Sequence, residues 1–246
     1  MNGAPPEILY LVVGRGGSRG VPGKNLRKIG GLSLVALKTI SARRSRYCTR
    51  LIVSSDSAEI QAEAKAHGAE VLFTRPAHLA THTASSDDVV LHAMDHIEDV
   101  EKRRYDAIML LEPASPFSRP SDYDAAVELY LRHKASLVVG MRGTPVNSIF
   151  VGPLRRDGRA DQIVGKFFNR PDLRRQAFEQ EYTMNGALYL IDWTHMRRTG
   201  KVYGDPDRTF GYPMDTFHSA EIDSLHDLRL AEFYVQNGDV DIAEWR

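Results

Sequence analysis

The chain has 246 residues, which is enough for one large α/β domain or for a domain with a small appendage. Lys plus Arg and Asp plus Glu number 32 each, so the formal net charge is zero, which disfavours a general nucleic-acid binder because such proteins are usually basic. No apolar run approaches the roughly 20 residues of a membrane span, so no membrane partner is expected.

The single cysteine, Cys48, excludes an intramolecular disulfide and fits a reducing compartment. The start of the chain, Met-Asn-Gly-Ala-Pro-Pro-Glu, lacks the basic and apolar regions of a signal peptide. These observations together predict a cytoplasmic protein.

A glycine-rich loop follows the first apolar run, residues 8–13. Its glycines and cations are Gly14, Gly16, Gly17, Gly20, Gly23, Arg15, Arg19 and Lys24. A buried strand that feeds such a loop presents backbone N–H groups and positive charge at the strand's carboxyl end, and this combination binds phosphates. The loop is not a Walker A sequence, because Asn25 stands where Ser or Thr is needed. It is not a dinucleotide fingerprint either, because Arg19 stands where glycine is needed.

After this loop, apolar segments typical of strands alternate with segments of helical composition. The expected strands are residues 8–13, 50–54, 69–73, 105–111, 136–141 and 182–190, and the expected helices are residues 32–41, 57–67, 87–101, 121–133 and 225–236. This rhythm predicts an α/β fold with a doubly wound, mostly parallel, Rossmann-like sheet and helices on both faces. Right-handed crossovers place the loops that follow the strands along one edge.

The periodicity is lost from Gly143 to about Glu181, where short β-like pieces at 148–151 and 162–168 alternate with charged turns. A structureless loop of this length is unusual in a compact domain. We therefore interpret residues 143–183 as an arm inserted in a single domain, 1–246, and expect the arm to pack on a second subunit.

The glycine-rich loop resembles the amino-terminal signature of the acylneuraminate cytidylyltransferase family, which reads roughly A-R-x-x-S-K-G-[LIV]-P-x-K-N. The matching residues are Arg15, Ser18, Gly20, Pro22, Lys24 and Asn25, and Arg19 replaces the usual lysine. The resemblance recurs at intervals over nearly the whole chain. These enzymes activate acidic sugars with CTP, so the resemblance implies a nucleotidyltransferase fold and catalytic roles for Arg15 and Lys24. The nucleotide contacts that it implies here are Val13, Gly14, Arg15, Gly16, Gly17, Ser18, Arg19, Lys24 and Asn25.

A second matching segment follows the third expected strand, where the family carries R-P-x-x-L-A-x-D-x-[AST]-S. By position, Arg75, Thr83 and Ser85 are expected to contact the nucleotide. Ser85 is also a candidate cap for the next helix, with Asp88 completing a capping box, and the two roles can coexist. His82 replaces the family's usual Asp.

Asp56 directly follows the strand expected at 50–54. It is placed either to orient a metal or a ribose or to cap the helix that follows, and the sequence leaves both open.

Glu112 is the most informative departure from the family, whose pattern here is L-L-Q-P-T-S-P-[LF]-R. In the family, this glutamine lies between the base and the acceptor, so Glu112 is expected to contact both. An ionised carboxylate accepts hydrogen bonds and donates none. It can receive the amine of cytosine or face a cation on the acceptor, and it would repel an acceptor carboxylate. Ser118-Arg119 is also one residue longer than the usual L-R.

Two further segments resemble acceptor-binding parts of the family. Asn185 and Tyr189 match the pattern [PL]-N-G-[AS]-[IL]-Y, and in a strand they share one face with Ala187. Arg175, within Arg174-Arg175-Gln176, resembles the family's arginine-bearing approach to the acceptor. The alternative for Tyr189 is that its ring fills the core, and the alternative for Arg175 is that it belongs to a solvated charge cluster.

Asp223 matches the family pattern D-I-D-x-x-x-D-[LF], and Glu221 replaces its first Asp with a side chain that is longer by one methylene. At i and i+2 of a strand their carboxylates would point to one side, which suits Mg²⁺, an ion that takes one or two carboxylates together with phosphate oxygens. The alternative is that they cap the last helix. Asp227 is expected to be structural, in the first turn of that helix.

The resemblance implies transfer of CMP from CTP to an acidic acceptor with release of pyrophosphate, by an enzyme that uses Mg²⁺ and forms a homodimer. The default acceptor is a 2-keto sugar acid of the sialic, pseudaminic or legionaminic type. A phosphonate acceptor, such as phosphonoformate, is the first alternative. A non-catalytic nucleotide-binding partner subunit is the second, and another nucleotide such as GTP stays open.

Overall fold

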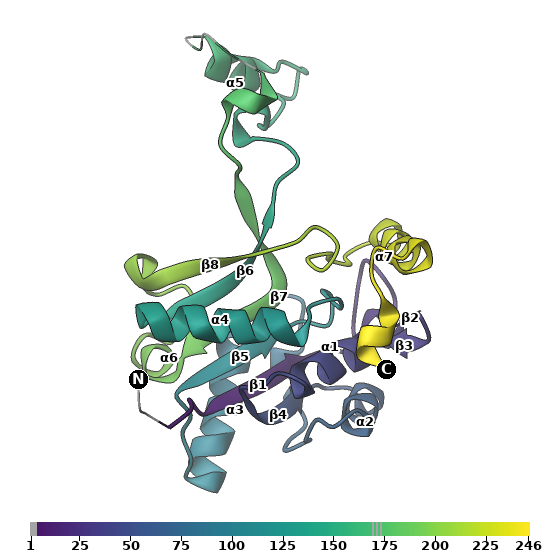
Figure 1. Ribbon diagram of the computed structural model, residues 1–246, viewed down its shortest axis with the longest axis vertical. Coiled ribbons are helices and arrows are strands. Elements are labelled where there is room, and N and C mark those ends of the chain that lie inside the picture. The colour runs from purple at the N-terminus through teal and green to yellow at the C-terminus, as the bar shows by residue number, and fades with distance from the viewer. Residues whose placement is uncertain (1–3, 169, 171, 173) are drawn as a thin grey trace.

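A six-stranded sheet forms the centre of the computed structural model, which describes residues 4–168, 170, 172 and 174–246. The strand order is β4-β1-β5-β7-β6-β8, and all strands are parallel except β7, which is antiparallel to both of its neighbours (Figure 1). The strands are β1 Ile8–Val13, β4 Cys48–Ser54, β5 Ala107–Leu111, β6 Leu137–Gly143, β7 Tyr182–Asp192 and β8 Thr209–Met214. The prediction of a mostly parallel, Rossmann-like α/β fold is confirmed.

Helices cover both faces of this sheet (Figure 1). The helices α1, α2 and α4 pack on one face, and α3 and α6 pack on the other. Their bounds are α1 Leu34–Arg43, α2 Ala58–Ala66, α3 Ser86–Glu101, α4 Pro120–His133 and α6 Trp193–Thr199. Between the two layers, β1 is inaccessible to solvent from Ile8 to Val12, as expected for a central parallel strand. Within the described ranges, no helix is long and apolar enough to span a bilayer.

A third cluster of buried side chains closes the edge where the parallel strands end. It joins α7 (Leu225–Asn237) to the small hairpin of β2 (Lys28–Ile29) and β3 (Leu32–Ser33). Trp245, near the end of the chain, packs edge-on against Phe117, with ring centroids 6.2 Å apart. The last part of the chain therefore supports the loops that follow β1 and β5.

Side-chain caps fix where most of these helices begin. In each case an oxygen accepts a backbone N–H two or three residues further along, which satisfies a donor that the first turn leaves free. The capping residues are Ser33, Ser57, Ser85, Asp192 and Ser224. The expected cap at Ser85 is thus confirmed, but its hydroxyl accepts the N–H of Asp87 and the capping box expected with Asp88 does not form.

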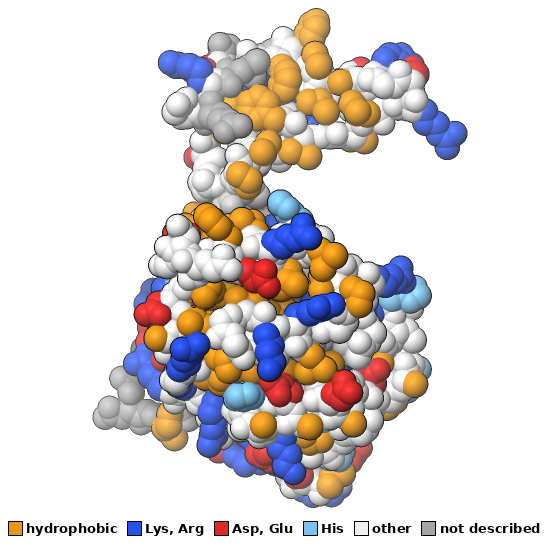
Figure 2. All heavy atoms as spheres, turned by 90° about the vertical axis from the view of Figure 1, so that its right-hand side faces the viewer, with side chains coloured by type: hydrophobic (Ala, Val, Ile, Leu, Met, Phe, Trp, Pro, Cys, Tyr) orange, Lys and Arg blue, Asp and Glu red, His pale blue; other side chains and the backbone are white. Residues whose placement is uncertain are grey.

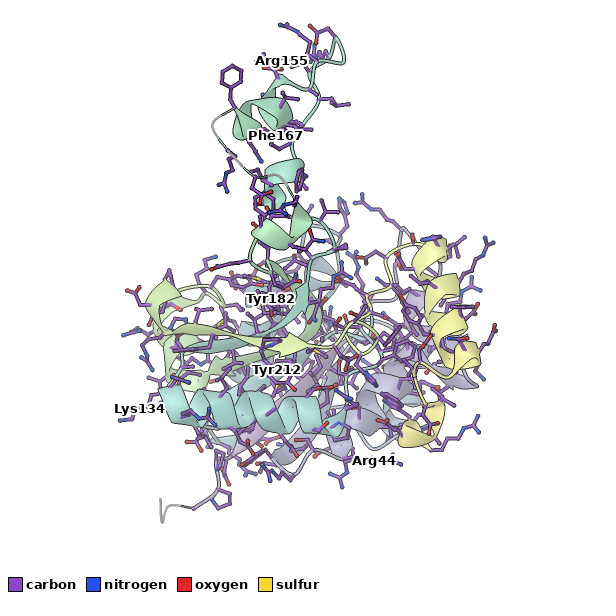
Figure 3. All side chains as sticks on the ribbon, turned by 45° about the horizontal axis from the view of Figure 1, so that its top comes forward. Arg44, Lys134, Arg155, Phe167, Tyr182 and Tyr212 are labelled. Carbon is purple, nitrogen blue, oxygen red and sulfur yellow. The ribbon has the colours of Figure 1, made fainter. Side chains whose placement is uncertain are left out.

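The segment between β6 and β7 projects from the body as an arm (Figure 1). Figure 3 shows Tyr182 at its base, with Phe167 and Arg155 farther out. The ring of Phe150 contacts Phe167 and Phe178, with centroids 5.5 and 5.6 Å apart, so the arm has a small aromatic centre of its own.

The β-like pieces expected in the arm at 148–151 and 162–168 are wrong. These stretches form 3-10 turns at Ser148–Phe150 and Gly165–Phe167 and the short helix α5, Asp161–Val164. Phe167 packs on Phe150 while Val151, Val164 and Phe168 are exposed, and these stretches pair with no described strand, so the alternation of apolar and charged residues did not indicate one.

The strand expected at 69–73 is also wrong. Only Glu70 pairs with β4, by a single bridge to Ile52. Phe73 packs instead against the rings of His92 and His96 on α3, so this apolar run serves the core without extending the sheet. The edge strand β8 and the helix α6 were not predicted, and Pro213 in β8 fits an edge position, where a missing N–H costs little.

Candidate active site

The carboxyl ends of β1 and β5 open into a cavity of about 330 Å³, which we call the nucleotide cavity. The residues predicted to contact nucleotide that line it are Val13, Arg15, Lys24, Asn25, Arg75 and Glu112. An adjoining cavity of about 280 Å³ shares Arg15, Lys24 and Asp223 with it and adds Ser18 and Arg19. The cations of the glycine-rich loop therefore surround one continuous space. Figure 2 views the molecule from the side of α7, where basic and acidic side chains intermix on the body beneath the arm.

Hydrogen bonds hold the glycine-rich loop, residues 14–25, in place. Asn25 Nδ2 donates to the carbonyl of Arg15 at 2.9 Å, and Arg15 Nη1 donates to the carbonyl of Thr81 at 2.8 Å. The backbone N–H of Gly16 donates to the Asp56 carboxylate at 2.8 Å. Asp56 therefore fixes the loop. The alternative that it caps α2 is wrong, because Ser57 takes that position.

The other predicted loop residues lie around this frame. Gly14 N–H donates to the carbonyl of Ser54 at 3.1 Å, which ties the start of the loop to β4. Neither Gly17 nor Thr83 is among the described residues that line the two cavities, and the hydroxyl of Thr83 lies 3.4 Å from that of Thr81.

Lys24 connects the glycine-rich loop near the start of the sequence to the acidic segment near its end. Its Nζ donates to the carbonyl of Ile222 at 2.7 Å and to Oδ1 of Asp223 at 3.1 Å. The Asp223 carboxylate is itself well exposed, with 71% of its side chain accessible, so it is available to a ligand in the cavity. The structure thus brings together the early basic loop and the late acidic residues.

The loop needs a glycine at position 20, where its backbone packs against the backbone of the acidic segment. A Cβ at Gly20 would lie 1.9 Å from the backbone oxygen of Asp223, a distance at which backbone must move. Ile222 N–H in turn donates to the carbonyl of Ala114 at 2.8 Å. Loops from three parts of the chain therefore meet backbone to backbone at this point.

Arg75 lies at the wall of the nucleotide cavity and is almost fully buried. Its Nε donates to the hydroxyl of Ser54 at 3.0 Å, and its Nη2 donates to the carbonyl of the same residue. Burial lowers the pKa of this guanidinium to about 10, so it is still a cation at neutral pH. The side chain has further N–H groups with which to meet a ligand.

Glu112 stands at the end of β5, between the nucleotide cavity and β7. Three polar side chains crowd Gly186: a Cβ there would lie 2.8 Å from Oε2 of Glu112 and 3.3 Å from Oε1 of Glu221 and from Oγ of Ser115, so a larger residue would displace the Glu112 carboxylate. Burial, and then the charge of Glu221, raise the pKa of Glu112. The buried Ser115 hydroxyl has no hydrogen-bond partner among the described residues, so it is a free donor beside the two carboxylates.

Glu221 and Asp223 do not lie in a strand as expected; their segment is an irregular loop before α7. Between them Ile222 is fully buried, and the two carboxylates have different neighbours, Glu112 for Glu221 and Lys24 for Asp223. Asp227 fixes the loop from the first turn of α7, since it accepts backbone N–H groups of Asp223 and Ser224. The predicted structural role of Asp227 is confirmed.

A second cavity of about 300 Å³, which we call the tyrosine cavity, adjoins the first across Leu110 and Ser86. Tyr189 and Tyr203 line it with their rings edge to face, centroids 6.4 Å apart. Ser85, predicted as a nucleotide contact, lies here and not in the nucleotide cavity.

The expectation that Asn185, Ala187 and Tyr189 share one face of a strand is wrong. The pairing of β6 with β7 shifts register between Val139 and Met141, so β7 bulges at this point. Ala187 faces the core under α1 and α4, whereas Tyr189 packs on the other face. The Asn185 side chain is buried, accepts the N–H of Ala187 at 3.1 Å, and lines neither the nucleotide cavity nor the tyrosine cavity.

Arg175 belongs to a 3-10 turn of the arm, and its side chain lies outside the part of the chain that the structure describes.

Lys38 is a residue of this region that the sequence interpretation missed. It lies in α1, is fully buried, and donates to Oγ of Ser118 at 2.8 Å and to the carbonyl of Ala187 at 2.9 Å. Burial lowers its pKa to about 7, against the charges of Glu112 and Asp122, which raise it. A lysine at helical spacing between the apolar Val35 and Ala42 was the available signal.

Comparison with known proteins assigns the family. The cytidylyltransferase profile matches residues 9–148. The chain belongs to the cytidylyltransferase family. It is therefore an enzyme that uses CTP, as the sequence predicted.

Relatives and a solved structure agree with this cytidylyltransferase assignment. The chain is 29% identical to post-translational flagellin modification protein B of Campylobacter coli over 94% of its own length and 95% of the relative's. It is also 29% identical to the CMP-N,N'-diacetyllegionaminic acid synthase of Campylobacter jejuni, over 93% and 95% of the two chains. A CMP:2-keto-3-deoxy-manno-octonic acid synthetase solved with CTP has the same fold, with a TM-score of 0.67 at 14% identity over 94% of this chain and 99% of that one.

Proposed function

We propose that this cytidylyltransferase transfers CMP from CTP to a hydroxyl of a 2-keto sugar acid, with release of pyrophosphate. One observation carries the proposal: Lys24 and Asp223 meet at the mouth of a cavity that also contains Arg15, Arg75 and Glu112. Cations for a triphosphate and carboxylates for its metal thereby converge beside one site. The relative named as a legionaminic acid synthase supports the sugar-acid acceptor.

In this proposal the chain positions charge and makes no covalent intermediate. Arg15, Arg19 and Lys24 hold the β- and γ-phosphates and stabilise pyrophosphate as it leaves. Lys24 is the main cation of the transition state. Arg75 holds the nucleoside, and the acceptor lies in the tyrosine cavity, where its hydroxyl faces the α-phosphorus past Glu112.

Asp223 and Glu221 are the proposed ligands of Mg²⁺. Within the described ranges, no group of three or more His, Cys, Asp or Glu side chains forms a metal site by itself. That fits an ion that takes one or two carboxylates and completes its shell with substrate phosphates. When bound, the ion polarises the phosphates and neutralises their charge. Asp223 is the better ligand, because its carboxylate is exposed at the cavity.

The decisive experiment supplies CTP, Mg²⁺ and one acceptor at a time, and measures pyrophosphate. We expect turnover with a nonulosonic acid, at a rate at least tenfold above that with phosphonoformate. Turnover of phosphonoformate alone would replace the sugar acid with a phosphonate. Tight CTP binding without turnover of any acid would instead indicate a nucleotide-binding partner subunit. Faster turnover with GTP than with CTP would show that GTP is the preferred nucleotide substrate.

We further propose that the arm joins two copies of the chain in the cytoplasm. Exposed apolar side chains gather on it: Val151, Leu154, Val164 and Phe168 are 54–87% accessible, and Figure 2 shows apolar surface along the arm. Contiguous apolar surface of this kind marks an interface.

Replacing Leu154 and Val164 by Glu tests the dimer, because buried unpaired charge opposes association. We expect sedimentation to show a dimer for the unmodified chain and a monomer for the double variant. The control variant Val100→Glu changes an exposed apolar residue of α3, 66% accessible, and is expected to stay dimeric. A monomeric unmodified chain would contradict the proposal.

A further inference from the structure

Lys38 places an amino group in the core beside the β7 bulge, on the face of the sheet that α1 and α4 cover. Its ammonium has two hydrogen-bond acceptors, the Ser118 hydroxyl and the carbonyl of Ala187, and lies 5.8 Å from the centre of the Tyr123 ring. Neither Lys38 nor Glu112 forms a direct ion pair with any described residue. A fully buried ammonium with only neutral direct partners is costly unless a carboxylate lies near.

Two carboxylates are near enough to act on Lys38, those of Glu112 and Asp122. Asp122 is already satisfied, since its oxygens accept from the backbone and guanidinium of Arg119 and from the hydroxyl of Tyr212. Glu112 is not satisfied in this way, and its charged neighbours include Glu221 and Asp223, which repel it, and Lys24, which Asp223 already pairs. Lys38 is therefore the cation left for Glu112.

The β7 bulge connects these two groups. Glu112 lies against Gly186, and Lys38 binds the carbonyl of the next residue, Ala187. Because Lys38 is fully buried and Glu112 is only partly exposed at the cavity wall, their attraction is screened less than that of a surface pair. Two departures from the family motif fall in this segment, Glu for Gln at 112 and the extra residue at Ser118-Arg119. Ser118 is the other group that Lys38 binds.

We infer that Lys38 and Glu112 work as one net-neutral unit that replaces the family's glutamine, and that Lys38 lets this site accept an anionic acceptor. The inference rests on the proposed transfer to a sugar acid. Glu112 alone would repel the acceptor carboxylate, as its chemistry predicts. With the buried lysine behind it, the carboxylate still accepts hydrogen bonds while the long-range repulsion is cancelled. Lys38 thus acts through Glu112, as a positioning residue.

The test is a double-variant cycle of K38M, E112Q and K38M/E112Q, run at about pH 6 so that Lys38, whose pKa burial lowers to about 7, is charged. Methionine keeps the length of lysine without its charge. For K38M we expect the KM for the sugar acid to rise about tenfold or more, with the KM for CTP within about twofold of the unmodified enzyme. For K38M/E112Q we expect the acceptor KM to return to within about threefold, because the site is neutral again. K65M, on the exposed side of α2, is the control and is expected to change neither constant.

A merely structural lysine would give the opposite result. Its loss would be equally harmful with Glu or Gln at 112, so failure of E112Q to rescue K38M overturns the inference. If K38M folds too poorly to assay, the same double-variant cycle is measured on the free energy of unfolding of the four proteins, by denaturant and without substrate. We expect the double variant to be more stable than K38M. If the stability losses of K38M and E112Q simply add in the double variant, the inference is also overturned.

Failure of the proposed function would be distinguishable from failure of this inference. If the unmodified enzyme turns over no sugar acid, the acceptor role of Lys38 fails together with the proposed function. The unfolding cycle, which needs no substrate, still decides whether Lys38 and Glu112 are coupled.

Discussion

The glycine-rich loop and the β7 bulge border the same site but are held by different means. The loop is fixed by hydrogen bonds from side chains to backbone carbonyls and by the contact of Gly20 with Asp223. The bulge is fixed by polar groups inside the core, the amide of Asn185 and the ammonium of Lys38. The loop therefore depends on shape, whereas the bulge depends on buried charge. This difference predicts that added bulk disturbs the structure of the loop, whereas loss of a buried polar or charged group disturbs the structure of the bulge.

The largest effect is expected for G20A. A Cβ at this position meets the Asp223 backbone at 1.9 Å, so Lys24 and Asp223 must separate. We expect kcat/KM to fall by about 100-fold or more, a loss comparable with removal of one transition-state donor. Pyrophosphate release measures it. Gly165→Ala is the matched control, because no described atom lies within 4 Å of the place that its Cβ would take, and full activity of G20A would show that the close contact is unimportant.

The next effect is expected for K24M, which removes the cation and leaves the loop backbone in place. We expect kcat to fall by about 100-fold, since the charge that forms on the leaving pyrophosphate loses its main partner. Steady-state kinetics with CTP measure kcat separately from KM. The control K28M changes an exposed lysine of β2 and is expected to keep kcat. A K24M enzyme with normal kcat and a raised KM alone would assign Lys24 to ground-state binding.

A smaller effect is expected from pH on the acceptor side. Burial lowers the pKa of Lys38 from 10.5 to about 7, so between these values the folded chain has released a proton that the unfolded chain keeps. The unfolded state then binds more protons, and stability rises with pH. Relative to K38M, the unmodified protein should gain up to about 1.4 kcal/mol per pH unit above pH 7. Denaturant unfolding at pH 7 and pH 9 measures this, and a constant difference would contradict it.

The smallest effect is expected for S224A. Ser224 and Asp227 form the capping box of α7 that also holds the Asp223 segment. Loss of the cap should cost about 1 kcal/mol of stability and lower activity only a few-fold. Thermal unfolding and pyrophosphate release measure the two. S57A, which removes the equivalent cap from α2, should cost similar stability without changing kcat.

The sequence predicted the nucleotide side well because its signals are local. Glycines and cations within residues 14–25, and the spacing of Glu221 and Asp223, indicated a phosphate loop and an acidic segment, and the structure brings Lys24 and Asp223 together. The parallel sheet followed from the alternation of apolar and helical segments. The cap at Ser85, which was predicted, also has a local cause.

The acceptor side was harder to predict because its geometry depends on distant residues. A register shift against β6 turns Asn185 into the core and sends Tyr189 to the opposite face, and residue spacing within β7 contains no sign of it. The role of Lys38 depends on its contacts with Ser118 and Ala187, which are 80 and 149 residues away in the sequence. The prediction of a strand at 69–73 was wrong for a similar reason, because Phe73 of this segment packs against α3, which is distant in the sequence.

The contact between Gly20 and Asp223 has a consequence for synthesis of the chain. The loop that receives the phosphates leaves the ribosome early, but the segment against which it rests emerges some 200 residues later. A nascent chain can therefore build most of the sheet while its first functional loop is still unsupported. Nucleotide binding should begin only when translation is nearly complete, which keeps partly made chains from sequestering CTP.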